Sequence, residues 1–156
     1  MNDEFFMKEA LREAQKAFDS DEVPIGAIAV HNNQIIGRGH NQTEGLKDPT
    51  AHAEILAITA AANALGSWRL TGVEMYVTVE PCTMCAGALV LARVKRIIFG
   101  ARDEKFGGCG SVFNVVKEPK LNHRIQVTES VMAGQAASLM KSFFEQKRKK
   151  SSGHDN

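Results

Sequence analysis

The chain has 156 residues, a length that suits one domain and is short for two. Hydrophobic residues make up 44% of it and charged residues 24%, which is ordinary for a soluble globular protein. The net charge of +1 excludes a generally basic, polyanion-binding composition, so any contact with RNA would have to come from a local patch of charge.

The spacing of the cysteines and the lack of long apolar runs predict a cytoplasmic location. Two of the three cysteines are three residues apart, which argues against a disulfide framework and for a metal or redox site in a reducing compartment. The acidic N-terminus precedes no long apolar run, so it lacks the pattern of a signal peptide. No stretch approaches the ~20 apolar residues that a membrane span needs. We expect a cytoplasmic protein without a membrane partner.

Hydrophobic periodicity and turn signals predict nine elements in the order α-β-β-α-β-α-β-β-α. In chain order they are a helix over 2–19, strands over 25–30 and 34–39, a helix over 50–65, a strand over 75–79, a helix over 81–92, strands over 96–100 and 125–128, and a helix over 130–147. Two helices lie between strands, so part of the sheet should be parallel, with helices on both faces. This pattern predicts an α/β fold.

Capping residues indicate where the helices begin and end. Asn2 or Asp3 can cap the first helix, and Thr50 can cap the second, with Gly66 as its C-terminal stop. Pro81 is expected to start the third helix. That helix has almost no polar face, which predicts that it lies within the core or at a subunit interface.

The segments between these elements are expected to be irregular. A turn over 31–33 joins the first two strands, and a polar loop covers 40–50. A long glycine-containing loop covers 101–122, with one helical turn near Phe113. We expect a single zinc-binding domain over 1–150, a fraying basic run at its end and a disordered tail over 151–156.

One motif carries most of the chemistry: His52-Ala53-Glu54, followed by Pro81-Cys82-Thr83-Met84-Cys85. Catalytic zinc takes three protein ligands and keeps a fourth position for water, and one imidazole with two thiols can supply those three. Thiols three residues apart at the start of a helix share one face, and the positive helix end favours the thiolate. The candidate metal ligands are therefore His52, Cys82 and Cys85, with one zinc ion per chain.

Glu54 is the candidate catalytic residue. A glutamate outside the metal's coordination shell can take a proton from the water and pass it to the substrate. The pattern H-x-E followed by P-C-x-x-C is typical of zinc-dependent nucleobase deaminases. The motif thus predicts hydrolytic deamination.

Two other interpretations of these cysteines stay open at this stage. Cys82 and Cys85 could form a redox pair, although a thioredoxin-like context is missing around them. A closed structural zinc site would need a fourth ligand, which only Cys109 could supply as a cysteine. The open three-ligand site is favoured because His52 is a better partner for these cysteines, and because Cys109 lies in what is expected to be a flexible loop, Gly107-Gly108-Cys109-Gly110.

With these residues in place, the chain resembles the bacterial tRNA-specific adenosine deaminases of the cytidine-deaminase-like superfamily. The resemblance covers nearly the whole chain. The stretches that carry it are Glu22-Val23-Pro24-Ile25-Gly26-Ala27, His40-Asn41, Pro49-Thr50-Ala51-His52-Ala53-Glu54, Trp68-Arg69-Leu70, Tyr76-Val77-Thr78, Glu80-Pro81-Cys82, Met84-Cys85-Ala86-Gly87-Ala88, Phe99-Gly100-Ala101, Asn122-His123-Arg124 and Phe143-Phe144.

The resemblance implies a three-layer α/β/α sandwich with a five-stranded mixed sheet, and a homodimer. It implies that the partner is a tRNA anticodon stem-loop, whose wobble adenosine becomes inosine with release of ammonia. Positions implied to bind the target nucleoside are Val23, Pro24, Asn41, Ala53 and Val79. Positions implied to bind RNA are Arg102, Asp103, Lys105, Phe144 and Arg148.

Three positions depart from the family pattern. Val79 stands where leucine is usual, which predicts a slightly roomier pocket. Glu145 stands where a basic residue is common, which predicts weaker phosphate contacts from the last helix. Cys109 lies in a loop that varies among relatives.

Several residues have structural interpretations beside the functional ones. Phe143 is expected in the core. Asp103 could cap its own loop or pair with Arg102, and Glu80 is expected to orient backbone or ligands. The basic run over 147–150 could be only a solvated helix end.

Two rival functions share parts of this pattern. A deaminase of a free base such as guanine would have the same zinc residues. A non-catalytic zinc-stabilised RNA-binding module would need neither Glu54 nor an open metal position. The sequence does not choose a tRNA species.

Overall fold

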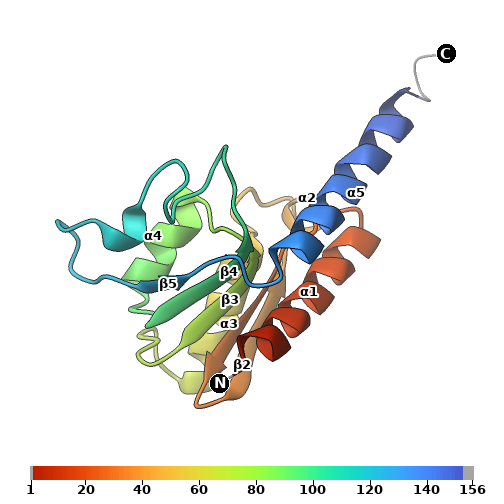
Figure 1. Ribbon diagram of the computed structural model, residues 1–156. Coiled ribbons are helices and arrows are strands. Elements are labelled where there is room, and N and C mark those ends of the chain that lie inside the picture. Colours follow the sequence, from red (N-terminus) through yellow and green to blue (C-terminus); the bar gives the residue numbers. More distant parts are fainter. Residues whose placement is uncertain (1, 153–156) are drawn as a thin grey trace.

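The computed structural model describes residues 2–152, which form a five-stranded mixed sheet between two layers of helices (Figure 1). The strands are β1 (Gly26–His31), β2 (Gln34–His40), β3 (Glu74–Val79), β4 (Arg96–Ala101) and β5 (Gln126–Thr128). Their order is β2-β1-β3-β4-β5, with β1 antiparallel to both neighbours and β3, β4 and β5 parallel. The three-layer α/β/α prediction is confirmed.

The helices cover both faces of the sheet. They are α1 (Asp3–Asp19), α2 (Thr43–Leu46), α3 (Ala53–Leu65), α4 (Thr83–Leu91), the 3₁₀ helix η1 (Val115–Lys117) and α5 (Ala133–Ser152). Side chains of α3 and α4 share a hydrophobic cluster with one face of the sheet, whereas α1 packs on the other. In β1, Ala27 and Ala29 belong to the first cluster and Ile28 and Val30 to the second, as the two-residue period of a strand requires.

Two glycines of β2 let α3 approach the sheet closely. A Cβ at Gly37 would lie 2.6 Å from the Ala57 carbonyl oxygen, and one at Gly39 would collide with the Ala53 carbonyl oxygen. The backbone of α3 therefore rests directly on β2, which sets the position of its N-terminal turn.

The hairpin and the first helix agree closely with the sequence predictions. Asn2 caps α1 by accepting a hydrogen bond from the amide of Phe5 at 3.1 Å. Asn32 and Asn33 both have positive φ, 52° and 62°, and form the two-residue turn between β1 and β2. Asparagine is one of the few residues that tolerates this left-handed backbone in a hairpin turn.

The second predicted helix begins later than expected. The N-cap of α3 is His52, and Thr50 instead donates its amide and hydroxyl to the Asp48 carboxylate at 2.8 and 2.7 Å. This local hydrogen bonding gives the backbone an alternative to helix, so the cap moves two residues on. Gly66 ends the helix in the left-handed region, as predicted. The expected polar loop before it contains the short helix α2.

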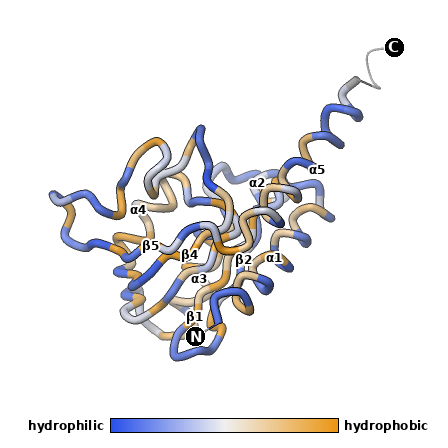
Figure 2. The backbone as a smooth tube through the Cα atoms, viewed as in Figure 1, coloured by the Kyte–Doolittle hydropathy of each residue, from blue (hydrophilic) through white to orange (hydrophobic). Residues whose placement is uncertain are grey.

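The third and last helices also differ from their predicted bounds. Cys82, in extended conformation, is the N-cap of α4, because the Pro81 carbonyl accepts from the Gly108 amide at 2.8 Å and lies outside the helix. The last helix continues through the basic run to Ser152, and its far end is hydrophilic in Figure 2. Of the tail expected to be disordered, 153–156 lie outside the described residues. No helix within 2–152 is long and apolar enough to cross a membrane.

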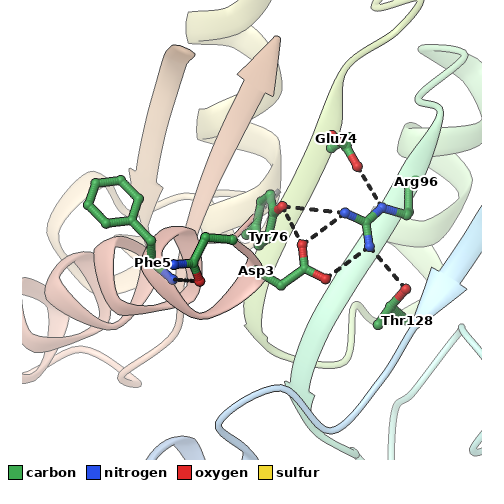
Figure 3. Close-up of polar contacts among 7 residues, drawn as sticks. Asp3, Phe5, Glu74, Tyr76, Arg96 and Thr128 are labelled. Atoms are coloured by element: carbon green, nitrogen blue, oxygen red, sulfur yellow. Dashed lines mark hydrogen bonds and ion pairs between the residues drawn. The ribbon is translucent and has the colours of Figure 1, made fainter. Parts of the chain in front are cut away.

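A polar network joins α1 to three strands (Figure 3). The Arg96 guanidinium contacts Asp3 at 2.9 and 3.1 Å and Glu74 at 2.6 Å. It also donates to the Thr128 hydroxyl at 3.1 Å, while Tyr76 donates its hydroxyl to Asp3 at 2.7 Å. Glu74 and Arg96 begin β3 and β4, so the network lies near the N-terminal ends of these two strands.

The network should contribute to stability in a pH-dependent way. The hydrogen bond from Arg96 lowers the pKa of the Asp3 carboxyl below 3.8. A lowered pKa means that this stability is present above the unfolded-state pKa and is lost as the pH falls through the folded-state pKa. We expect Asp3→Asn to lower the free energy of unfolding by about 1–2 kcal/mol at pH 7, with a smaller loss below about pH 4. Urea unfolding at both pH values measures this.

The matched control is Glu4→Gln. It removes a charge from the same first turn, and the Glu4 side chain is exposed. A loss from Glu4→Gln equal to that from Asp3→Asn would assign the effect to the helix dipole rather than to the Arg96 network.

Candidate active site

Two helix N-termini meet at the candidate metal ligands. His52 caps α3, Cys82 caps α4, and Cys85 lies in the first turn of α4. The His52 Nδ1 atom is 3.6 Å from the Cys82 sulfur and 3.5 Å from the Cys85 sulfur. The fold thus brings together the three side chains that the sequence motif singled out.

These distances fit a tetrahedral zinc site. The ligand atoms of His52, Cys82 and Cys85 all lie within 4.8 Å of one another. Zinc binds sulfur at about 2.3 Å and nitrogen at about 2.0–2.1 Å. At a tetrahedral angle, a sulfur and a nitrogen bound to the same ion would be about 3.6 Å apart. One imidazole and two thiols also match the donor atoms that zinc prefers. The residues present fit a zinc ion with one open coordination position.

The thiols of Cys82 and Cys85 differ in acidity. A hydrogen bond from Cys85 lowers the pKa of Cys82 to about 4, and the same bond raises the pKa of Cys85. The Cys82 thiolate in turn raises the pKa of His52. Binding of zinc requires both thiolates and a neutral imidazole, so it would release protons from this cluster.

Glu54 lies beside the ligands in the first turn of α3 and is 3% exposed. Burial raises the pKa of its carboxyl to about 7, and the Cys85 sulfur is one of its hydrogen-bond partners. A carboxyl that titrates near neutral pH can both accept and donate a proton under physiological conditions. Its position and its pKa suit the proton-carrying role that the sequence predicts.

Hydrogen bonds join the predicted nucleoside-binding residues to the same place. The Asn41 side-chain oxygen accepts from the Ala53 amide at 2.8 Å, and the Asn41 amide donates to the Ile25 carbonyl at 3.1 Å. The amide of Gly26 donates to the Thr78 hydroxyl at 3.1 Å. The segment that carries Val23 and Pro24 therefore lies against the end of β3, where Val79 is buried.

Glu22 is a structural residue of this region that the sequence analysis missed. Its side chain is 3% exposed and accepts from the amides of Glu44 and Gly45 at 2.9 and 2.8 Å. It holds α2 against the segment before β1. An acidic residue next to Val23-Pro24 was the only signal available, and an acid in a loop is ordinarily solvated.

Glu80 fastens the loop after β4 to the metal ligands. Its buried carboxylate accepts from the amides of Asp103, Cys109 and Ser111 at 3.1, 3.0 and 3.1 Å, and from the Ser111 hydroxyl. Burial alone would raise the pKa of Glu80, but these four donors lower it. The expectation that Glu80 orients backbone is confirmed. Gly107, on the loop that Glu80 holds, pairs with Cys82 in a β-bridge.

Comparison with known proteins assigns the chain to a family. The family model of MafB19-like deaminases matches residues 1–148. A tRNA-specific adenosine deaminase of Aquifex aeolicus (strain VF5) is 51% identical over 148 residues, which cover 95% of this chain and 97% of that protein. One of Bacillus subtilis (strain 168) is 48% identical, over 95% of this chain and 92% of that protein. The chain belongs to the family of tRNA-specific adenosine deaminases.

A solved structure supports the same assignment. It comes from structural studies of A-to-I editing by tRNA:A34 deaminases at the wobble position of transfer RNA. It is 44% identical, covers 86% of this chain and 98% of its own, and superposes with a TM-score of 0.84. The tRNA-specific adenosine deaminase family therefore accounts for both the sequence and the fold.

The predicted RNA-binding residues fall into two groups: some line a surface groove, and others contact neighbouring residues of the protein. Lys105, Phe144 and Arg148 line a groove of about 490 Å³ between the loop after β4 and the end of α5. Arg102 pairs instead with the exposed Glu129 at 2.9 Å. The Asp103 carboxylate accepts from the Lys105 and Phe106 amides and so caps its own loop.

The two adjacent phenylalanines of α5, Phe143 and Phe144, differ in burial. Phe143 is 4% exposed, and its ring packs on Phe18 with centroids 6.0 Å apart. Phe144 is 43% exposed and faces the groove, and the neighbouring Glu145 is exposed as well. The prediction that Phe143 belongs to the core is confirmed.

Cys109 lies outside the metal-ligand group. It is 7% exposed and belongs to the hydrophobic core cluster, where burial raises the pKa of its thiol. Within residues 2–152, the candidate metal group consists of His52, Cys82 and Cys85 alone. This arrangement favours the open site over a closed four-ligand site.

Metal analysis tests the ligand set directly. We expect about one zinc ion per chain in the purified protein and its loss in Cys85→Ser, because two ligands do not hold zinc firmly. Cys109→Ala should keep the metal and is the matched control. Loss of zinc from Cys109→Ala, with folding intact by circular dichroism, would instead support the closed site.

Proposed function

We propose that this chain hydrolyses the exocyclic amine of the wobble adenosine in a tRNA anticodon loop, forming inosine and releasing ammonia in a zinc-dependent reaction. One observation carries the proposal: a buried Glu54 beside an open His-Cys-Cys ligand set, in a chain that belongs to the family of tRNA-specific adenosine deaminases. A tRNA substrate is consistent with the cytoplasmic location expected from the sequence.

His52, Cys82 and Cys85 would hold the zinc ion. When bound, zinc supplies a Lewis acid that makes water acidic near neutral pH. The two thiolates balance the charge of the ion, and the positive ends of α3 and α4 stabilise those thiolates. The chain thus provides a nearly neutral, half-buried site rather than a strongly charged one.

Glu54 moves the protons of the reaction. Its carboxylate takes a proton from the nucleophilic water and delivers it to N1 of the adenine ring. As oxygen bonds to C6, the same carboxyl receives the second proton of the water and passes it to the leaving amine. The C6–N bond then breaks and ammonia departs, so every proton passes through one side chain.

The target base must leave its stack to reach this buried carboxyl. A base in a single-stranded loop is already poorly stacked, so extruding it costs little. Asn41, the backbone of Ala53 and the segment with Val23 and Pro24 are proposed to receive the nucleoside, with Val79 behind them. The hydrogen bond between Asn41 and Ala53 supports this, because it holds two of these groups at the entrance to α3.

The flanking RNA is proposed to lie in the groove lined by Lys105, Phe144 and Arg148. An exposed ring between basic side chains is the usual composition of a single-stranded nucleic-acid groove. Arg102 would contribute only after exchanging its Glu129 partner for a phosphate, and both side chains are about half exposed, so this exchange costs little.

We also propose a homodimer through the apolar surface around α4. The α4 apolar surface consists of Met84, Leu91, Phe113 and Leu121, which are 38%, 70%, 61% and 38% exposed. Phe113 shares one hollow with Met84 and another with Leu121, and Leu91 lies on α4 with Met84. Exposed apolar side chains gathered in this way mark interaction sites. A second copy of the chain is the partner that the family resemblance implies.

The assay that tests the activity compares RNA with free bases. We expect inosine on an anticodon stem-loop RNA with adenosine at the wobble position, and no ammonia from free guanine, adenine or cytidine. Ammonia from guanine without inosine in RNA would favour the free-base rival. RNA binding without turnover of any substrate would favour the zinc-stabilised binding module.

Glu54→Ala provides the control for chemistry. We expect the rate to fall by at least ~10²–10⁴-fold with zinc retained, because general acid–base catalysis contributes that much. Unchanged turnover of the zinc-loaded Glu54→Ala protein would contradict the role of Glu54.

Sedimentation velocity tests the dimer. We expect a dimer at micromolar concentration, and dissociation in Leu91→Glu, since a buried unpaired carboxylate is costly at an apolar interface. Leu46→Glu is the matched control, because Leu46 is 53% exposed and belongs to α2, away from the α4 apolar surface. A strictly monomeric wild-type protein would contradict the proposal.

A further inference from the structure

An exposed aromatic ring, that of Phe106, lines the same hollow as the candidate metal ligand Cys82. Phe106 is 67% exposed. Within residues 2–152, none of the ring–ring or cation–ring contacts includes it. A phenylalanine left mostly in water forgoes the free energy that its burial would release. A ring held out in this way is a candidate for contact with a ligand.

The loop beneath the ring is well ordered. The Phe106 amide donates to the Asp103 carboxylate at 3.1 Å, and the next amide, of Gly107, donates to the Asp103 carbonyl at 2.9 Å. A Cβ at Gly107 would collide with the Glu80 carboxylate, so the loop lies directly on the Glu80 side chain. The backbone of Phe106 is therefore fixed relative to Cys82, and binding there would cost little additional ordering.

Two adjoining hollows connect this ring to the metal site and to the basic end of α5. Phe106 lines a hollow of about 260 Å³ together with the metal ligand Cys82 and Lys105. Lys105 also lines the groove of about 490 Å³ that holds Phe144 and Arg148. Around the shared Lys105, the surface therefore presents the rings of Phe106 and Phe113 on the side of Cys82, and the ring of Phe144 with Arg148 on the side of α5.

Alternating rings and cations are suited to single-stranded nucleic acid, because bases stack on the rings and phosphates approach the cations. We propose that Phe106 is the stacking platform for a nucleotide adjacent to the target adenosine. This inference rests on the proposed RNA substrate and adds a residue that contacts the flanking base. Stacking there would hold the neighbouring nucleotide beside the metal site while the adenosine occupies the pocket.

A second copy of the chain is the competing occupant. Met84, Val112 and Phe113 line the same hollow, and two of them belong to the α4 apolar surface. The basic residues favour RNA, because Lys105 lines the Phe106 hollow and Lys147 and Arg148 line the next groove. An apolar dimer contact would gain nothing from this charge, whereas a polyanion would.

Substitution at position 106 tests the proposal through KM and kcat on the stem-loop RNA. We expect Phe106→Ala and Phe106→Leu to raise KM by about 5- to 150-fold, the factor by which loss of one base–aromatic stack weakens binding, with a smaller change in kcat. Phe106→Tyr should restore the wild-type KM, because it keeps the ring. Phe5→Ala is the matched control, since Phe5 is 53% exposed on α1.

An RNA with an abasic nucleotide on either side of the adenosine gives the decisive comparison. Wild-type protein should lose as much affinity for one of the two abasic RNAs as Phe106→Ala loses for the intact RNA. Phe106→Ala should then be indifferent to that abasic site. Equal losses from the abasic site in both proteins would overturn the stacking role.

The remaining outcomes are distinguishable. If wild-type protein forms inosine and Phe106→Ala keeps the wild-type KM, the inference fails and the proposed function stands. If wild-type protein forms no inosine in RNA, the proposed function itself fails. A shift toward monomer in sedimentation of Phe106→Ala, with KM unchanged, would assign the ring to the second copy and overturn the inference.

Discussion

The close approach of two helix N-termini at the end of β3 is the constraint on which the site depends. Gly37 and Gly39 let the backbone of α3 rest on β2, and the chain passes directly from β3 through Glu80 and Pro81 into α4. The imidazole of one cap and the sulfur of the other are consequently 3.6 Å apart. Any side chain larger than hydrogen at Gly39 would push α3 away and separate these ligands.

Two carboxylates at this site are both shielded from solvent but have opposite properties. Glu54 and Glu80 are each 3% exposed. Burial raises the pKa of Glu54 to about 7, because few donors compensate for the lost water. Glu80 also loses water, but three amides and one hydroxyl donate to it, so its pKa is lowered and it remains an anion that holds the loop. The deeper burial of Glu54 and the four donors to Glu80 together separate a group that can exchange protons from one that serves as structure.

The loop that Glu80 holds connects the candidate metal ligands to the surface beside α5. Gly107 pairs with Cys82, while Lys105 and Phe106 on the same loop line the hollows between the candidate metal site and α5. A shift of the metal ligands would therefore move these surface residues as well. The many hydrogen bonds of this loop keep these positions fixed, whereas an ordinary surface loop is more mobile.

Much of the fold could be predicted from local signals. Asn2 begins α1, Gly66 ends α3, and the Asn32-Asn33 turn closes the hairpin, because each depends on hydrogen bonds or φ values within a few residues. The starts of α3 and α4 were misplaced by a few residues, because contacts with Asp48 and with the amide of Gly108 compete with the helix. The last helix extends to Ser152, beyond the end that its basic composition predicts.

The sequence by itself determined which atoms can bind a metal and move protons. His52, Glu54, Cys82 and Cys85 have that chemistry wherever they lie, and their spacing already placed each pair on one helix turn. Only the tertiary structure decided that the two turns meet, that Cys109 belongs to the core, and that Glu80 receives four hydrogen bonds. It also left Phe106 exposed beside Cys82. These outcomes depend on distances between segments far apart in the chain, which no local pattern encodes.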